Sequence, residues 1–134
     1  MEFETVCAIF SVRFTIIDNN LLFTISFMMG ARAIGMHPCN YWPEFGINML
    51  EDLRDNRFEK IQKDMIDKVM PFYKFWKSIE SEYTSGDGYL DKLCMELIGS
   101  PSSRCRPPTR DIRNRYRKET VEMMKKTGVP GLII

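Results

Sequence analysis

The sequence predicts an α/β protein in which two short strands near the N-terminus precede a long helical region. The first forty residues are rich in β-branched and aromatic side chains and contain few strong helix formers, which favours strands. After Pro43 the apolar residues recur every three or four positions, which is the period of a helix. We therefore divide the chain into a strand–helix–strand region, residues 1–42, and a helical region, residues 43–134.

The N-terminal region reads as strand, short helix, strand. The segment Thr5–Ile17 predicts a strand, and Asp-Asn-Asn at 18–20 is a turn or helix N-cap signal. A short helix is expected at Leu21–Met29, ended by Gly30, which tolerates a left-handed conformation. A second strand is expected at Arg32–His37. This order is a βαβ unit, and βαβ units build parallel sheets.

The helical region begins at Pro43, because proline suits the first position of a helix. The first helix is expected to end at Asp55–Asn56. A second helix carries an apolar stripe from Phe58 to Tyr83 over about seven turns. Pro71 falls inside this stripe and is expected to kink the helix rather than end it.

Two further helices follow in the C-terminal half. Asp87 is expected to cap the third helix and Gly99 to end it. Asp111 is expected to cap the last helix, which closes at Gly128 after two lysines and shortly before a proline.

The composition is that of an ordinary globular domain, with 134 residues, 44% hydrophobic and 28% charged. A net charge of +1 gives no general attraction to nucleic acid or to acidic membranes. The apolar stretch Thr5–Met29 is interrupted by Arg13 and by the polar residues 18–20, so neither part reaches the roughly 20 residues of a membrane span. The acidic start is unlike the basic beginning of a signal peptide. We expect a cytoplasmic protein.

Metal and cofactor binding are not expected. The four cysteines, Cys7, Cys39, Cys94 and Cys105, are far apart in the sequence and form no closely spaced pair. Structural zinc sites usually take ligands from such pairs, and His37 is the only histidine. We interpret the cysteines as buried free thiols.

Three segments together carry a family resemblance. They are Gly30-Ala31-Arg32-Ala33-Ile34-Gly35 followed by Asn40, then Met70-Pro71 within a long helix, and then Arg106-Pro107-Pro108 before the final helix. In this order and spacing they resemble the C-terminal part of the dihydrodipicolinate synthase and N-acetylneuraminate lyase family, over about residues 11–134. No single segment is specific by itself.

The resemblance implies the C-terminal fragment of a (β/α)8 TIM barrel. On this interpretation Phe14–Ile17 and Ala33–His37 are the last two barrel strands, and the region after Pro43 is a C-terminal helical extension. A complete barrel needs about 250 residues, so this chain has room for only part of one.

The resemblance also implies a lyase or aldolase that forms a Schiff base between a lysine and pyruvate or another 2-oxo acid. The first lysine is Lys60 and the first tyrosine is Tyr41, both beyond the expected strands, so the catalytic lysine and tyrosine are absent. We expect no catalytic residue here and no activity of the chain alone. In a completed barrel, Gly35 and His37 would line the substrate site; packing or simple exposure is the alternative for His37.

Two other kinds of function stay open. The chain could be a non-catalytic oligomerisation or interaction module, forming a homo-oligomer or joining a full-length family member, as the resemblance implies. A basic helical domain that binds nucleic acid is the third interpretation, and a solvated helix face is its structural alternative. The basic residues concerned are Arg104, Arg106, Arg110, Arg113, Arg115, Arg117 and Lys118.

Overall fold

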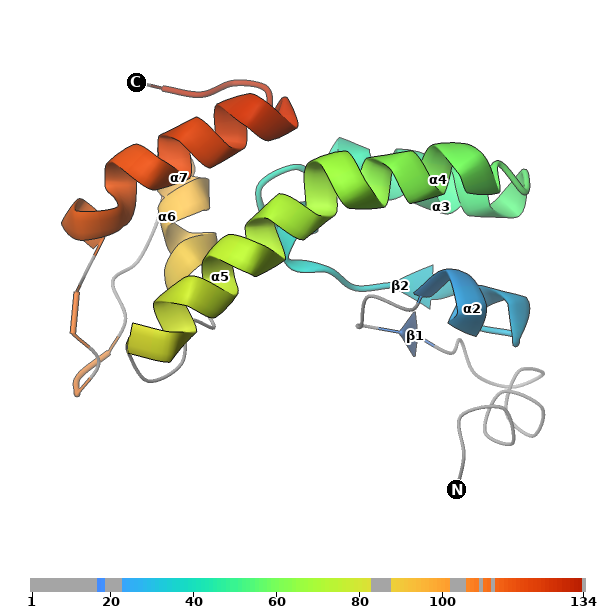
Figure 1. Ribbon diagram of the computed structural model, residues 1–134, viewed down its shortest axis with the longest axis horizontal. Coiled ribbons are helices and arrows are strands. Elements are labelled where there is room, and N and C mark those ends of the chain that lie inside the picture. The colour runs from blue at the N-terminus through green and yellow to red at the C-terminus, as the bar shows by residue number, and fades with distance from the viewer. Residues whose placement is uncertain are drawn as a thin grey trace. The chain divides into compact units, whose positions relative to one another are not determined.

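The computed structural model describes residues 17–18, 23–82, 88–101, 106–108, 110–111 and 113–133 (Figure 1). Most of these residues are helical. The chain divides into two compact units, which we describe separately: unit 1 comprises Met1–Cys39 and Pro43–Gln62, and unit 2 comprises Asn40–Trp42 and Lys63–Ile134.

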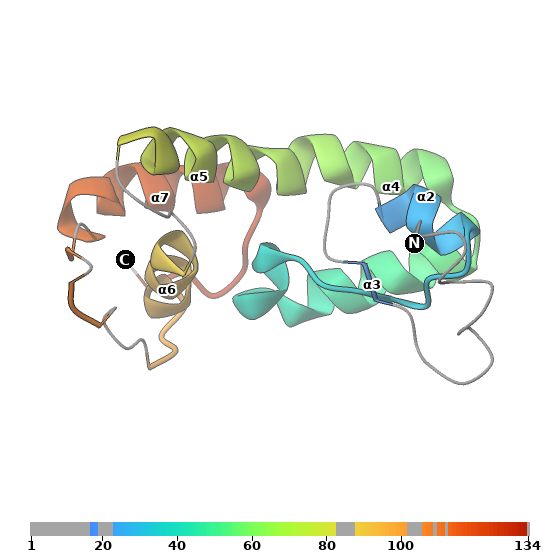
Figure 2. The ribbon, with the colours of Figure 1, turned by 90° about the horizontal axis from the view of Figure 1, so that it is seen from below.

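The described residues of unit 1 form a short parallel strand pair, three α-helices and a 3-10 helix. Strand β1 pairs with β2 in the register Ile17↔Ala33 and Asp18↔Ile34, and α3 contacts β2 (Figure 2). The elements are β1 Ile17–Asp18, α2 Phe23–Met28, β2 Ala33–Ile34, the 3-10 helix η1 His37–Asn40, α3 Pro43–Arg54 and α4 Phe58–Asp64, whose last two residues belong to unit 2.

The predicted barrel fragment is wrong for the residues that the structure describes. Each strand is two residues long, and the helices account for most of the described chain. Two residue pairs cannot form the continuous, twisted wall that barrel closure requires. Residues 5–16 of the first predicted strand lie outside the described residues, so that part of the prediction is not tested.

The second predicted strand is shorter than expected. It was expected to reach His37, but β2 ends at Ile34 and His37 is the first residue of η1. Pro38 explains the difference, because proline has no N–H to donate to a strand partner and its fixed φ suits the first turn of a helix. His37 therefore does not lie at the end of a strand.

The helix ends follow the local sequence signals. At the end of α3, Asn56 has φ 58°, its N–H donates to Leu53 O, and the N–H of Arg57 donates to Asp52 O at 2.8 Å. This pair of bonds is a Schellman cap, with asparagine in place of the usual glycine. Gly30, Gly99 and Gly128 end α2, α6 and α7 with the same pair of bonds and positive φ.

The long predicted helix is present, with one irregular stretch. It runs as α4, then a π-helical turn η2 (Met65–Val69), then α5 (Met70–Glu82). The N–H of Met70 donates to Met65 O, five residues back. Pro71 cannot donate, and its ring would collide with the carbonyl of Asp67 in a regular α-helix. The wider π turn immediately before Pro71 relieves that collision, and the helix continues through the proline as predicted.

Unit 2 packs η2, α5, α6 (Tyr89–Leu97) and α7 (Arg113–Thr127) around one apolar core; α7 contacts α6, α5 and η2 (Figure 1). The N–H of Arg113 donates to Asp111 Oδ1 at 3.2 Å, which confirms the predicted cap of the last helix. Asp87, the predicted cap of α6, lies outside the described residues. The core comprises Tyr41, Phe72, Ile79, Leu90, Leu93, Cys94, Leu97, Met123, Met124 and Val129.

Candidate functional site

The two residues predicted to line a substrate site lie in the connection between β2 and η1. Gly35 directly follows β2, His37 begins η1, and both are half-buried. Neither lines either of the two hollows described below. Their role was conditional on a completed barrel, and it stays a prediction.

Next to them is an open apolar groove, which we call the Ile47 groove. It has a volume of about 240 Å³ and is formed by β2, η1 and residues 43–50 of α3. Ile47, at its rim, is 59% exposed. The groove is lined by Ala33, Ile34, Cys39, Pro43, Gly46, Ile47 and Leu50, none of which is charged.

Gly46 lets η1 and α3 approach each other closely. A Cβ atom at position 46 would collide with Cys39 Sγ, so any other residue there would require the thiol to move. Burial raises the pKa of Cys39, although a backbone hydrogen bond with Met36 acts in the opposite direction. A thiol with a raised pKa is mostly protonated at neutral pH and is a poor nucleophile. The groove therefore offers shape and apolar contact rather than covalent chemistry.

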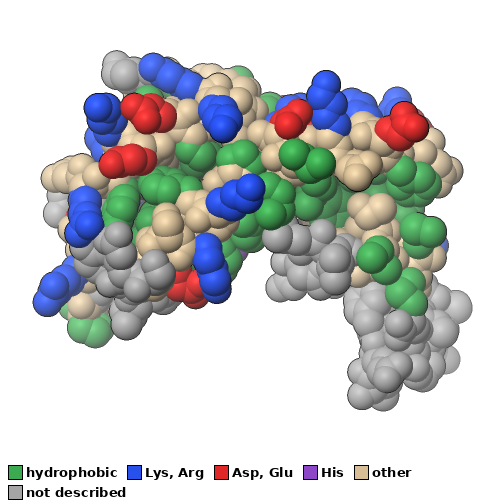
Figure 3. All heavy atoms as spheres, in the orientation of Figure 1, with side chains coloured by type: hydrophobic (Ala, Val, Ile, Leu, Met, Phe, Trp, Pro, Cys, Tyr) green, Lys and Arg blue, Asp and Glu red, His purple; other side chains and the backbone are tan. Residues whose placement is uncertain are grey.

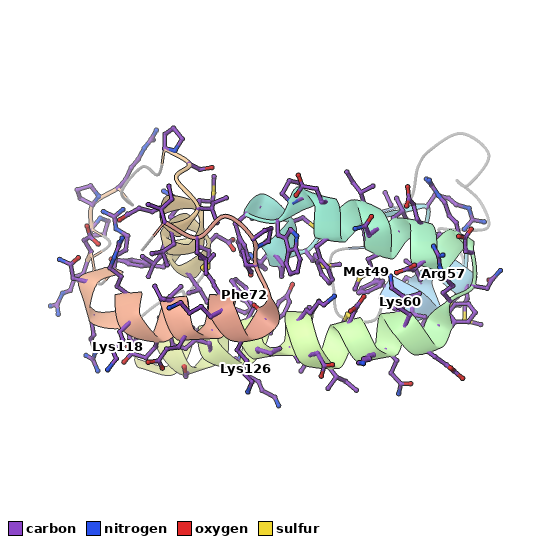
Figure 4. The ribbon with its side chains drawn as sticks, turned by 90° about the horizontal axis from the view of Figure 1, so that it is seen from above. Met49, Arg57, Lys60, Phe72, Lys118 and Lys126 are labelled. Carbon is purple, nitrogen blue, oxygen red and sulfur yellow. The ribbon has the colours of Figure 1, made fainter. Side chains whose placement is uncertain are left out.

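A buried carboxylate fixes the turn between α3 and α4. The side chain of Asp52 is 3% exposed; Arg57 Nε lies 2.7 Å from Asp52 Oδ1, and Lys60 Nζ forms an ion pair with Oδ2. In Figure 4 Arg57 and Lys60 lie close together at this end of α3. A buried charge needs such partners, so this arrangement is structural.

Two arginines of the predicted basic cluster are held by acidic residues. Arg113 Nη2 lies 2.8 Å from Asp111 Oδ2, and Arg113 Nη1 lies 2.9 Å from Glu96 Oε2. The other oxygen of Glu96 binds Arg117 Nη1 at 2.7 Å, so Glu96 of α6 holds two arginines of α7. The hydrogen bond to Asp111 raises the pKa of Arg113, and the charges of Asp111 and Glu96 add to the effect.

The remaining basic side chains of α7 are mixed with acidic ones. Arg115 and Lys118 are exposed, and so are Glu119 and Glu122 on the same helix. Figure 3 shows blue and red side chains together over α7. This mixture favours a solvated face over a phosphate-binding surface. Arg104 lies outside the described residues.

The interior of unit 2 contains a carboxylate and a thiol on adjacent turns of α6. Asp91 is 8% exposed and accepts a hydrogen bond from Asn40 Nδ2 at 3.2 Å. Cys94, one turn later, is fully buried; burial, together with the negative charge of Asp91, raises its pKa strongly. Cys94 is therefore part of the core rather than a reactive group.

Within the described part of the chain, no three histidine, cysteine or acidic side chains gather as a metal site would require. Of the four cysteines, Cys39 is half-buried and Cys94 is buried, while Cys7 and Cys105 lie outside that part. Among the described helices, none is both long and apolar enough to span a membrane.

A second hollow lies in unit 2 and was not predicted from the sequence. It is lined by Ile66, Asp67, Pro71, Lys74 and Lys126 and has a volume of about 510 Å³. Its residues come from η2, α5 and the end of α7, so no local sequence signal brings them together.

The chain was compared with protein families and with curated proteins. No protein-family model matches the chain, and no curated protein is significantly similar to it. The resemblance to pyruvate-dependent lyases therefore stays an expectation from the sequence.

Proposed function

We propose that this chain is a non-catalytic interaction module that associates with a second copy of itself through the Ile47 groove. The observation that carries the proposal is the exposed apolar lining of this groove. Ile47 is 59% exposed beside a hollow whose lining residues carry no charge. Contiguous exposed apolar surface, when it is large, marks protein–protein contact sites and ligand-binding grooves.

The charge of the chain favours a second copy as the partner. A net charge of +1 produces little repulsion between two copies. The groove lining has no charged side chain, so covering the lining itself buries no charge; Glu44 and Glu51, about one turn from Ile47 on α3, are exposed and would stay at the rim in solvent. In a two-fold dimer the same patch is used on both copies, so Ile47 of each copy would pack against the partner.

Helix α2 offers further apolar surface in unit 1. Ile25 is 55% exposed and Met28 is 72% exposed, three residues apart on one side of the helix. The opposite side of α2 is buried through Phe23 and Ser26. Ile25 and Met28 therefore form an exposed apolar face of α2.

A lyase activity is not part of this proposal. The chain's lysines all lie on the described helices, and each is exposed or half-exposed. A lysine that forms a Schiff base is usually activated by desolvation or by a neighbouring cation. None of the lysines is buried, so none is activated by full desolvation. Lys74 and Lys126 share a hollow, but both are exposed, so solvent screens the effect of each charge on the other, and this supports a non-catalytic role.

The test is self-association of the full chain and of two variants. Ile47→Glu places a charge in the proposed interface. Asn48→Glu, at the next, exposed position of α3, adds the same charge outside the groove lining. We expect Ile47→Glu to weaken dimerisation at least about tenfold, because each copy loses the burial of one isoleucine. Asn48→Glu should dimerise like the unmodified chain. Equal dimerisation of both variants in sedimentation equilibrium would overturn the proposal.

A further inference from the structure

The hollow in unit 2, which we call the Lys74–Lys126 hollow, combines an apolar wall with two basic side chains. Ile66 and Pro71 provide the apolar wall, and Ile66 is 60% exposed. Lys74 lies on α5, and Lys126 lies in the last turn of α7. The volume of about 510 Å³ falls within the range of about 300–1,000 Å³ typical of sites for small molecules.

The shape of the hollow depends on the irregular part of the long helix. Ile66 and Asp67 belong to the π turn η2, and Pro71 follows one residue after it. Single π turns within helices occur frequently at functional sites. Helix α7 contacts both η2 and α5, and this contact places Lys126 at the same hollow as Lys74. Figure 4 shows Lys126 at the C-terminal end of α7.

The charges in the hollow do not neutralise one another. It contains two ammonium groups and one carboxylate, that of Asp67. No ion pair joins Lys74, Lys126 or Asp67 to another side chain that the structure describes. Three other cations of unit 2 do have acidic partners: Lys68 has Asp64, Lys77 has Glu80 and Arg113 has Asp111. The hollow is therefore a place where positive charge remains available next to apolar surface.

We propose that the Lys74–Lys126 hollow binds a small organic anion with an apolar body. The anionic group, a carboxylate or a phosphate, would lie near the two ammonium groups. The apolar body would cover Ile66 and Pro71, and Asp67 would accept a hydrogen bond from a donor on the ligand. This site is separate from the Ile47 groove, and it does not depend on the proposed self-association.

The experiment uses the full chain labelled with ¹⁵N and follows its amide signals during titration with 1-naphthoate, 1-naphthyl phosphate and the neutral 1-naphthamide. We expect both anions to shift the signals of Ile66, Asp67, Lys74 and Lys126 with saturation. The neutral amide should bind less tightly. The dissociation constants of 1-naphthoate and 1-naphthyl phosphate show whether the hollow prefers a carboxylate or a phosphate.

Three variants decide whether the site is the one proposed. Lys74→Ala and Lys126→Ala should each weaken binding of the anions about fivefold, the effect of one exposed charge at close range. Lys118→Ala, on the same helix but eight residues earlier and outside the hollow, should leave binding unchanged. All three lysines are exposed, so the variants should fold. Equal effects of Lys118→Ala and Lys126→Ala, equal binding of the neutral amide, or no saturable shifts at the hollow would overturn the proposal.

Discussion

Arg57 and Asp52 form an ion pair across the turn that joins α3 to α4, with Arg57 Nε 2.7 Å from Asp52 Oδ1. The carboxylate is 3% exposed, whereas the arginine is 51% exposed. The backbone N–H of Arg57 also donates to Asp52 O. Arg57 therefore both caps α3 through its backbone N–H and compensates the buried charge of Asp52 through its side chain.

Replacement of Arg57 by alanine should destabilise the fold. Asp52 would keep only Lys60 as a cationic partner, and a buried carboxylate with incomplete compensation is costly. Because Arg57 is half in solvent, we expect a loss of about 1–2 kcal/mol in the free energy of unfolding rather than the full cost of breaking a buried pair. Urea denaturation measures this loss.

Arg54→Ala is the matched control for Arg57→Ala. Arg54 is exposed in the last turn of α3 and forms no ion pair with another side chain that the structure describes. The same charge is removed, but Asp52 keeps both partners. A loss of stability in Arg54→Ala as large as in Arg57→Ala would mean that net charge, and not this ion pair, sets the stability.

Stability should fall at alkaline pH because of Cys94. Its pKa is raised in the folded protein above the usual value of 9.0, since burial and the charge of Asp91 disfavour the thiolate. The folded state therefore retains the thiol proton at a pH where the unfolded state has released it. The stabilisation that the protonated Cys94 gives to the folded state is complete below about pH 9. Above that pH, the free energy of unfolding falls by up to about 1.4 kcal/mol per pH unit.

The variant Cys94→Ala separates this effect from the titration of other groups. At neutral pH it should be less stable than the unmodified chain by about 1 kcal/mol, because a small cavity replaces the sulfur. This difference should shrink as the pH rises from 8 to 10 in urea denaturation. A difference that stays constant over that range would show that Cys94 does not ionise on unfolding as we expect.

Nucleic acid should bind weakly and without a steep dependence on salt. Arg113 and Arg117 are already paired with Glu96, and α7 also carries two exposed acidic residues, Glu119 and Glu122. A protein that neutralises several phosphates loses affinity steeply with salt, because counterions are released. Titration of a labelled RNA at several salt concentrations measures this dependence. Tight binding would restore the nucleic-acid interpretation if the logarithm of the association constant fell with a slope of several units against the logarithm of the salt concentration.

The chain should form no imine with pyruvate. Borohydride treatment in the presence of pyruvate, followed by intact-mass measurement, should give no stoichiometric adduct, since no lysine is buried in any part of the chain that the structure describes. Free lysine at equal concentration serves as the reference for background labelling. A stoichiometric adduct on one lysine would contradict the non-catalytic proposal and would identify the activated residue.

The helix boundaries could be predicted because their signals are local. Pro43 begins α3, Asp111 caps α7, and Gly99 and Gly128 end their helices, as the sequence indicates. Each signal depends on the conformation of one residue or on a hydrogen bond over a few residues.

The sheet and the hollows could not be predicted in the same way. The barrel expectation failed because strand pairing depends on partners distant in sequence, and the described pairing extends over only two residue pairs. The Ile47 groove depends on the approach of Cys39 to Gly46, and the second hollow on the packing of α7 against η2. Neither of these contacts, Cys39 with Gly46 or α7 with η2, can be read from a local sequence pattern. The π turn before Pro71 was missed because proline predicts a local disturbance but not its form.

The central claim, that this is a self-associating, non-catalytic module, is tested most directly by sedimentation equilibrium of the unmodified chain over a wide range of concentrations. We predict an average mass that rises from that of one copy, 15.8 kDa, toward that of two as the concentration increases. A mass that stays at the value of a single copy throughout would contradict the claim.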